Sequence, residues 1–275
     1  MLNINYKARL SFLLCLCVYS APSFATGPRV APSLFTSNTA FLYTSDFPPF
    51  ISSKAENQGL LIEIINTVLK SSDITAEVNI LPSKNMAKYY FSQENALAII
   101  GYDFNFSKQT QQKSIFIPIL SIDEYYYTHA SVQQKFKWNG KLSSFKNKVY
   151  GTTKGNNVEK YKAAGIKVKY GRLHNLLQKM QKGQVDFIKS PQLTLNAELH
   201  TDFPQQQSAF IKMETKAAES VLGIAFNTQH ADGKQSAEKF KQGLQKIITS
   251  AEFNSILQGY LGSEVDVKPY LKHLK

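Results

Sequence analysis

From residue 40 onwards the chain alternates short apolar stretches with amphipathic ones, and this alternation limits the possible folds most strongly. Residues 40–44, 76–81 and 97–101 are short and mostly apolar, which is typical of strands. One helix face between the first two strands is formed by apolar residues at helical spacing: Leu61, Ile64, Ile65, Val68 and Leu69. A second, shorter helix is expected at 85–91. Strands that alternate with helices predict an α/β fold with mostly parallel sheets, because parallel strands are joined by crossover helices.

A second set of alternating elements follows a polar and basic segment at 133–145. Its expected strands and helices lie at 148–152, 157–164, 168–170, 174–181 and 185–188. The apolar stretch 221–226 predicts another buried strand, and a final helix at 252–261 is expected to end at Gly262, a typical helix C-cap. We expect residues 264–275 to form a frayed or loosely packed tail.

The first 25 residues have the layout of a secretory signal peptide. Lys7 and Arg9 precede an apolar run, and a small-x-small cleavage pattern ends at Ala25. The run is shorter than the roughly 20 apolar residues that cross a bilayer. A buried core helix is the alternative interpretation of the same run. We therefore expect export, cleavage near Ala25 and a mature protein in the periplasm.

Cysteine content and charge narrow the function. Both cysteines, Cys15 and Cys17, lie in the expected leader, so the mature chain would have no thiol for a disulfide, a metal site or a nucleophile. Loss of Lys7 and Arg9 with the leader lowers the formal charge from +12 to +10. The basic residues are mostly lysines spread along the chain, which favours a solvated surface over a nucleic-acid site.

Five short segments occur in an order that is typical of one known family. They are 46–50 (Asp-Phe-Pro-Pro-Phe), 59–64 (Gly-Leu-Leu-Ile-Glu-Ile), 145–151 (Phe-Lys-Asn-Lys-Val-Tyr-Gly), 154–157 (Lys-Gly-Asn-Asn) and 183–187 (Gly-Gln-Val-Asp-Phe). Over residues 40–262 the chain thus resembles the type II periplasmic solute-binding proteins, in particular the polar amino acid receptors of ABC importers (family 3). The resemblance implies a two-lobed α/β fold, each lobe a mostly parallel sheet flanked by helices, with a ligand cleft between the lobes.

The resemblance also implies a division of the chain in which lobe 1 is made of two segments and lobe 2 is inserted between them. The expected parts are a signal peptide at 1–25, lobe 1 at 38–130 and 220–263, lobe 2 at 131–219, and a tail at 264–275. Two connecting segments, near 127–132 and 213–220, would act as the hinge that closes the lobes on a ligand.

In open α/β sheets, ligands bind beyond the carboxyl ends of the strands. The loops there supply the expected ligand-binding residues: Asp46, Phe47, Asn85, Tyr102, Gln109, Lys154, Asn156, Asn157 and Lys189. Free backbone N–H groups around 155–157 would attract an anion, whereas the alternative is that Asn156 or Asn157 only caps the following helix. The aromatic residues near the cleft, including Phe50 and Tyr125, have a second interpretation as core or hinge packing.

The residues with which amino acid receptors of this family hold their ligand are not matched here. The arginine that grips the carboxylate corresponds to Lys108 or Gln109. The acidic residue that neutralises the ammonium group corresponds to the segment 189–191 (Lys-Ser-Pro), where Lys189 is expected to repel that group. A related subgroup of the family has the segment Pro-Trp-x-Arg after the second strand. Here residues 82–85 read Pro-Ser-Lys-Asn, so both the tryptophan and the arginine are replaced. The sequence therefore predicts a polar or anionic small solute rather than a standard α-amino acid.

Two other functions stay open. An enzyme would need a catalytic or metal pattern, but the five histidines show no His-x-x-x-His spacing, and neither a Gly-x-Ser-x-Gly elbow nor a phosphate loop occurs. A binding lobe that has lost its ligand could serve as an interaction or sensory subunit. We expect a monomer without catalysis, cofactor or metal that binds a small molecule and not nucleic acid. Its expected partner is an inner-membrane ABC permease or a sensor.

Overall fold

The computed structural model describes residues 39–92, 96–102, 108–132, 137–154, 156–263 and 266–274, and of Gln109 only the backbone. Residues from 39 onwards belong to one compact unit. The expected signal peptide lies outside the described residues. Among the residues that are described, no helix is long and apolar enough to cross a membrane.

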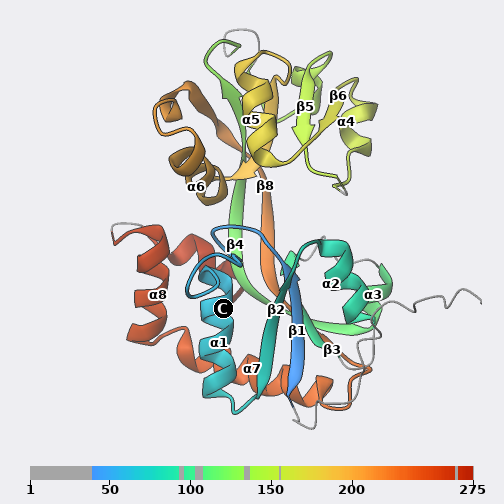
Figure 1. Ribbon diagram of the computed structural model, residues 1–275, viewed down its shortest axis with the longest axis vertical. Coiled ribbons are helices and arrows are strands. Elements are labelled where there is room, and N and C mark those ends of the chain that lie inside the picture. The colour runs from blue at the N-terminus through green and yellow to red at the C-terminus, as the bar shows by residue number, and fades with distance from the viewer. Residues whose placement is uncertain are drawn as a thin grey trace, which may run out of the picture. The chain divides into compact units, whose positions relative to one another are not determined.

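The strands of the described residues join into one sheet in the order β2-β1-β3-β8-β4-β7-β5-β6. Their bounds are β1 (Ala40–Ser45), β2 (Ala76–Leu81), β3 (Ala96–Tyr102), β4 (Ser114–His129), β5 (Val149–Thr152), β6 (Lys167–Tyr170), β7 (Phe187–Pro191) and β8 (Phe210–Asn227). At one end β1 pairs in parallel with β2 and β3, and at the other end β5 pairs in parallel with β6 and β7. The long strands β4 and β8 pair antiparallel and run through both ends (Figure 1).

This arrangement confirms the predicted two-lobed α/β fold. The outer strands of each lobe are parallel, whereas β8 pairs antiparallel with β3, and β4 pairs antiparallel with β7. We call the end with β1–β3 lobe 1 and the end with β5–β7 lobe 2. Lobe 1 carries the helices α1 (Leu60–Ser71), α2 (Lys84–Phe91), α3 (Lys108–Gln112), α7 (Gly233–Ile247) and α8 (Ala251–Leu261). Lobe 2 carries α4 (Glu159–Ala163), α5 (Leu173–Gln181), α6 (Gln192–Asp202) and the 3-10 turns η3 (Leu142–Phe145) and η4 (Gln207–Ala209). The residue boundaries predicted for the lobes stay a prediction.

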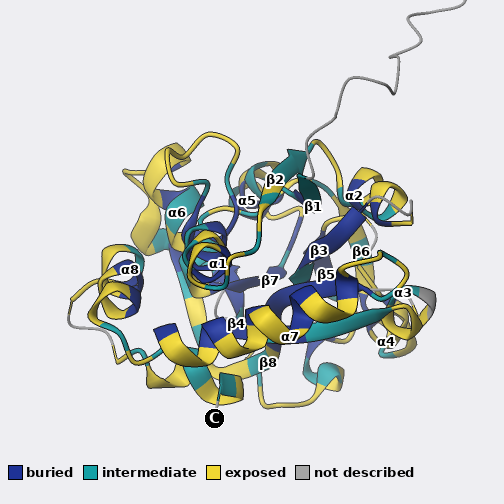
Figure 2. Cartoon of the chain, turned by 90° about the horizontal axis from the view of Figure 1, so that it is seen from below, coloured by how far each residue is buried: buried dark blue, intermediate teal, exposed yellow. Residues whose placement is uncertain are grey.

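Each lobe has its own apolar core. In lobe 1 the predicted apolar face of α1 is buried against the sheet, together with the inner faces of α7 and α8. Figure 2 shows the buried inner face and the exposed outer face of α7. In lobe 2 the rings of Tyr126, Phe145 and Phe187 meet at centroid distances of 4.1 to 5.4 Å. Strand β8 returns from lobe 2 to pair with β3, as the position of the stretch 221–226 predicts.

Several elements were not predicted. Strand β4 contains Pro118, which argues against a central strand, but the structure places this proline at a register shift between β4 and β8, where the regular pairing is interrupted anyway. The first half of β8 has no continuous apolar run, because Lys212, Glu214, Thr215 and Lys216 are polar and exposed. Helix α6 buries only Leu195 and Leu199, so it lacks the apolar stripe by which a helix is recognised. Both predicted hinge segments overlap these long strands, and their hinge role stays a prediction.

The prediction of a loosely packed tail is wrong. Residues 268–274 form a 3-10 helix, η5 (Lys268–Leu274), and Tyr270, Leu271 and Leu274 pack against the core of lobe 1. Lys272 contacts Glu219 on β8 at 2.5 Å and Asp123 on β4 at 3.7 Å. Lys216 contacts both of these carboxylates at 3.1 Å. The tail thus neutralises two acidic residues that face each other across the central strand pair.

This ion network predicts an acid-sensitive part of the stability. Hydrogen bonds from Lys272 and Lys216 lower the pKa of Glu219 from 4.5 to about 2. The folded-state pKa lies below the ordinary value, so Glu219 stabilises the fold above pH 4.5, and this contribution is lost as the pH falls towards 2. In urea unfolding, the gap in unfolding free energy between the wild type and Glu219→Gln should shrink from pH 6 to pH 3. An equal gap at both values would contradict the prediction.

Candidate functional site

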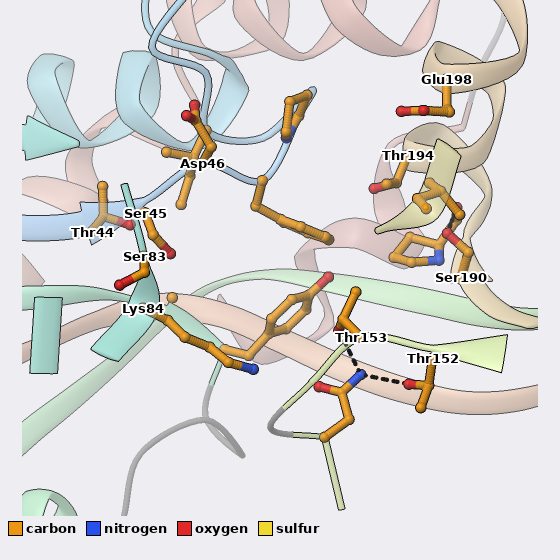
Figure 3. Close-up of a pocket in the computed structure, with 18 of the residues that line it drawn as sticks. Thr44, Ser45, Asp46, Ser83, Lys84, Thr152, Thr153, Ser190, Thr194 and Glu198 are labelled. Carbon is orange, nitrogen blue, oxygen red and sulfur yellow. Dashed lines mark hydrogen bonds between the residues drawn. The ribbon is translucent and has the colours of Figure 1, made fainter. Parts of the chain in front are cut away.

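A cleft of about 750 Å³ is lined by residues from both lobes. Lobe 1 contributes the loop after β1, the end of β3 and the start of α2, and lobe 2 contributes the ends of β5 and β7 together with α6. The strands β1, β3, β5 and β7 thus present their carboxyl ends to the cleft, and α/β sheets bind ligands at such ends. In the close-up, Asp46, Ser83 and Lys84 lie on one side, and Thr153, Thr194 and Glu198 lie on the other (Figure 3).

The structure brings together most of the residues that the sequence predicts for the site. Those that line the cleft are Asp46, Phe47, Tyr102, Lys154, Asn156 and Lys189. Asn85 and Asn157 are exposed and are not among the lining residues. Asn85 lies one residue further along α2 than Lys84, whose side chain takes the cleft side of the helix. The side chain of Gln109 lies outside the described residues. A ligand-binding role stays a prediction for all nine.

The loop after β1 is held by contacts with its own neighbours. The Asp46 carboxylate accepts hydrogen bonds from the backbone N–H of Ser53 at 2.7 Å and from its hydroxyl at 2.9 Å. At the start of α1, the N–H groups of Leu60 and Leu61 donate to carbonyls of this loop at 3.1 and 2.8 Å. Gly59, just before α1, lets the two backbones approach this closely. The loop is therefore a fixed wall of the cleft.

The aromatic residues divide between the cleft and the core. Phe47 meets Tyr102 edge to face at a centroid distance of 5.0 Å, and both line the cleft. Burial raises the pKa of Tyr102, and the Glu124 charge raises it further, so its hydroxyl stays neutral. Phe50 is fully buried in the core of lobe 1, and the ring of Tyr125 lies under the ammonium group of Lys212. Phe50 therefore belongs to core packing, as the alternative interpretation holds.

The turn after β5 places amide and hydroxyl groups at the cleft. The Asn156 amide donates to the hydroxyl oxygens of Thr152 and Thr153 at 3.0 and 3.1 Å, drawn as dashed lines in Figure 3. Asn157 accepts a hydrogen bond from the N–H of Glu159, the first residue of α4, but the N-cap position of this helix is occupied by Val158. Gly155 lies outside the described residues, so anion binding by the backbone of this turn stays a prediction.

The surroundings of Lys189 differ from the expectation, because an acidic side chain lies next to it. Its ammonium group forms an ion pair with the Glu124 carboxylate, which belongs to the buried part of β4. The antiparallel pairing of β4 with β7 places Glu124 opposite Pro191. The prediction that Lys189 would repel an ammonium group is therefore wrong, because a carboxylate already neutralises it. Sequence reasoning missed Glu124 because it lies 65 residues away on a strand that was not predicted.

Other lysines at the cleft lack such a partner. Among the described residues, Lys54, Lys84, Lys88 and Lys154 line the cleft and none forms an ion pair with an acidic residue. Burial lowers the pKa of Lys84, and the nearby charge of Lys88 lowers it further. An anion close to these two ammonium groups would favour their charged forms and so oppose both effects. The lobe 1 side of the cleft is thus suited to negative charge.

The lobe 2 side is acidic where α6 forms the wall. Glu198 and Asp202, one helical turn apart, line the cleft, and His174 at the start of α5 contacts Asp202 at 2.8 Å. Burial and the neighbouring Asp202 carboxylate raise the pKa of Glu198. The buried hydroxyl oxygen of Thr194 has no hydrogen-bond partner among the described residues. This wall offers groups for a polar ligand that sequence reasoning missed.

No protein-family model matches the chain, and no curated protein matches it. Solved structures do. The GluR0 ligand-binding core from Nostoc punctiforme in complex with L-glutamate is 14% identical, with a TM-score of 0.62, over 81% of this chain and 99% of that chain. A probable amino-acid ABC transporter extracellular-binding protein from Bacillus subtilis is 14% identical, with a TM-score of 0.64, over 82% and 99%. A histidine kinase sensor domain with similarity to periplasmic binding proteins is 12% identical, with a TM-score of 0.63, over 82% and 96%.

These similarities define the class of fold. The described chain has the two-lobed architecture of the type II periplasmic binding proteins, as the order of its segments predicts. The similar structures include binding proteins of transporters and a sensor domain.

Proposed function

We propose that this protein is an exported solute-binding protein that captures a small polar or anionic solute for an ABC-type importer or a sensor. The observation that carries the proposal is the cleft of about 750 Å³ between the strand ends, lined by lysines that pair with no acidic side chain in the part of the chain that the structure describes. Its volume falls within the range of small-molecule sites. Its polar lining comes from both lobes, so that a bound solute would hold them together.

The charge distribution supports an anionic group on the ligand. On the lobe 1 side the cations lack acidic partners among the described residues, whereas Glu124 is neutralised by Lys189 and Asp46 already accepts hydrogen bonds from Ser53. Lys54, Lys84 and Lys88 outnumber Asp46 on this side of the cleft, so the net charge near Lys84 is positive. An amino group elsewhere on the ligand could lie at the acidic wall of α6, so a zwitterion is less strongly disfavoured than the sequence predicts.

The alternatives receive different support. A sensory role is favoured by the similarity to a histidine kinase sensor domain. A subunit that has lost its ligand is disfavoured, because the cleft is open rather than filled by side chains. We propose no catalysis, in line with the solved structures of similar fold, which are binding proteins. Periplasmic export, a monomeric state and the absence of nucleic-acid binding remain parts of the proposal that rest on the sequence.

A thermal-shift screen tests the proposal with the full chain and a library of organic acids, short peptides and amino acids. We expect stabilisation by at least one anionic or polar solute. Lys84→Gln should weaken its binding at least about tenfold, because a hydrogen bond to a charged group contributes roughly 1.5–3 kcal/mol. Lys70→Gln is the matched control, because it removes the same charge at an exposed position that does not line the cleft.

Three outcomes would count against the proposal. A response to no solute would contradict solute binding. A response only to zwitterionic amino acids would contradict the anionic preference. Equal affinity of Lys84→Gln and Lys70→Gln would place the anionic group of the ligand elsewhere.

A further inference from the structure

Three potential metal ligands from two helices converge at the wall of the cleft in lobe 2. His174 lies at the start of α5, and Glu198 and Asp202 lie four residues apart on α6. One ligand atom from each residue lies within 4.8 Å of the other two. Among the described residues, no other group of histidines and carboxylates meets this condition. All three side chains are partly exposed, so an ion could reach them.

The separations fit a shared cation. The Nδ1 atom of His174 lies 2.8 Å from Asp202 Oδ2 and 3.6 Å from Glu198 Oε1. Two ligand atoms that each lie 2.0–2.2 Å from a tetrahedral zinc ion are roughly 3.3–3.6 Å apart, which is close to the second of these values. A small movement of the side chains would therefore place one ion in contact with all three.

A side-chain amide lies beside the second ring nitrogen of the histidine. Its Nε2 atom lies 2.9 Å from the amide nitrogen of Gln178, one turn further along α5, and Nδ1 is directed at the two carboxylates. A metal-binding histidine donates the N–H of its second ring nitrogen to an acceptor. Rotation of the Gln178 amide by 180° would supply its oxygen as that acceptor and free Nδ1 for an ion. The ring also packs against Phe203 at a centroid distance of 5.3 Å.

The geometry points to a divalent transition-metal site formed by His174, Glu198 and Asp202, at which Zn²⁺ or a similar first-row ion binds in the wall of the cleft. An imidazole with two carboxylates favours such ions over Ca²⁺ or Mg²⁺, which prefer oxygen ligands alone. Three protein ligands leave coordination positions open. Glu198 projects from α6 towards the cleft, so water or a donor atom of a solute could occupy such a position (Figure 3).

This site differs from the sequence expectation of no metal. A His-x-x-x-His pattern lies within one helix, whereas the histidine and the carboxylates of this cluster come from two helices. His174 and Glu198 are 24 residues apart in the sequence. Helix α6 was itself not predicted. The proposal concerns the ion alone, so it can be tested before any solute is known.

The test is calorimetric titration of Zn²⁺ into the full chain after treatment with a chelator. Cys15 and Cys17 are alkylated beforehand, because they are the only thiols of the chain. We expect one ion per chain and a loss of affinity of at least tenfold in His174→Ala and in Glu198→Gln. His200→Ala is the matched control. It removes an exposed histidine of α6, the helix that carries Glu198, but His200 lies outside the cluster, so this variant should bind the ion as the wild type does.

A spectroscopic measurement separates a metal site from a simple ion pair. Co²⁺ in place of Zn²⁺ should give visible absorption that disappears in His174→Ala, with circular dichroism verifying that the variant is folded. If the wild type binds no ion, the cluster is only a salt bridge and the proposal is overturned. It is equally overturned if His174→Ala and Glu198→Gln retain the affinity of the wild type.

Discussion

Replacing Lys189 by methionine is expected to lower the free energy of unfolding by about 3 kcal/mol. The variant leaves the Glu124 carboxylate without a counter-charge in a position that is only 7% exposed. Removal of one partner from a buried ion pair typically costs about 3–5 kcal/mol, because the remaining charge is not solvated. Lys189 itself is 19% exposed, which places the expected loss at the lower end. Urea unfolding at neutral pH measures it.

The double variant Lys189→Met with Glu124→Leu is the decisive control. It removes both charges and leaves apolar side chains of similar size, so most of the lost stability should return. A loss below about 1 kcal/mol in Lys189→Met would mean that water reaches Glu124. A double variant no more stable than Lys189→Met would mean that packing, not charge, explains the loss.

Replacing Gly59 by alanine should destabilise the protein by about 3 kcal/mol or more and should also disturb the cleft. Gly59 has φ 95° and ψ 164°, a region that essentially only glycine adopts, and strain there costs about 1–3 kcal/mol. A Cβ atom would in addition lie 2.7 Å from the Pro49 carbonyl oxygen and 2.8 Å from the Phe50 carbonyl carbon. These are backbone atoms of the loop that carries Asp46 and Phe47, so the clash displaces a wall of the cleft.

Gly140→Ala separates the two causes. Gly140 also has a positive φ, 87°, but nothing lies within 4 Å of a Cβ atom built there. Its replacement should therefore show the backbone strain without the clash. We expect Gly59→Ala to lose clearly more stability in urea unfolding and to weaken solute binding, whereas Gly140→Ala leaves binding unchanged. Equal losses in the two variants would contradict the role assigned to the approach of the loop.

Local patterns predicted much of lobe 1 because its elements are recognisable one at a time. The apolar face of α1 matches the buried residues, and Gly262 ends α8 with a φ of 94°. Strand β2 has the predicted bounds, and the observed bounds of β3 extend the prediction by one residue at each end. Each of these signals lies within about ten residues and follows from burial of one face or from the freedom of a glycine.

The charges of the cleft could not be predicted in the same way, because they depend on contacts between distant segments. Glu124 meets Lys189 only through the register of β4 with β7. Glu198 and Asp202 lie on α6, which was not predicted because its apolar pattern is weak. They meet His174 only because α5 and α6 pack together. The sequence thus locates the loops around the cleft, whereas strand register and helix packing determine which charges are neutralised.

The central claim is that a small solute occupies this cleft, and Gly101 offers the most direct test. Gly101 lines the cleft at the end of β3, and nothing lies within 4 Å of a Cβ atom built on it. Gly101→Phe should therefore place an aromatic ring inside the cleft, where it obstructs a solute, without disturbing the fold. Titration calorimetry of the strongest solute from the screen should give one site in the wild type and no measurable binding in Gly101→Phe. Undiminished binding by a folded Gly101→Phe variant would contradict the account.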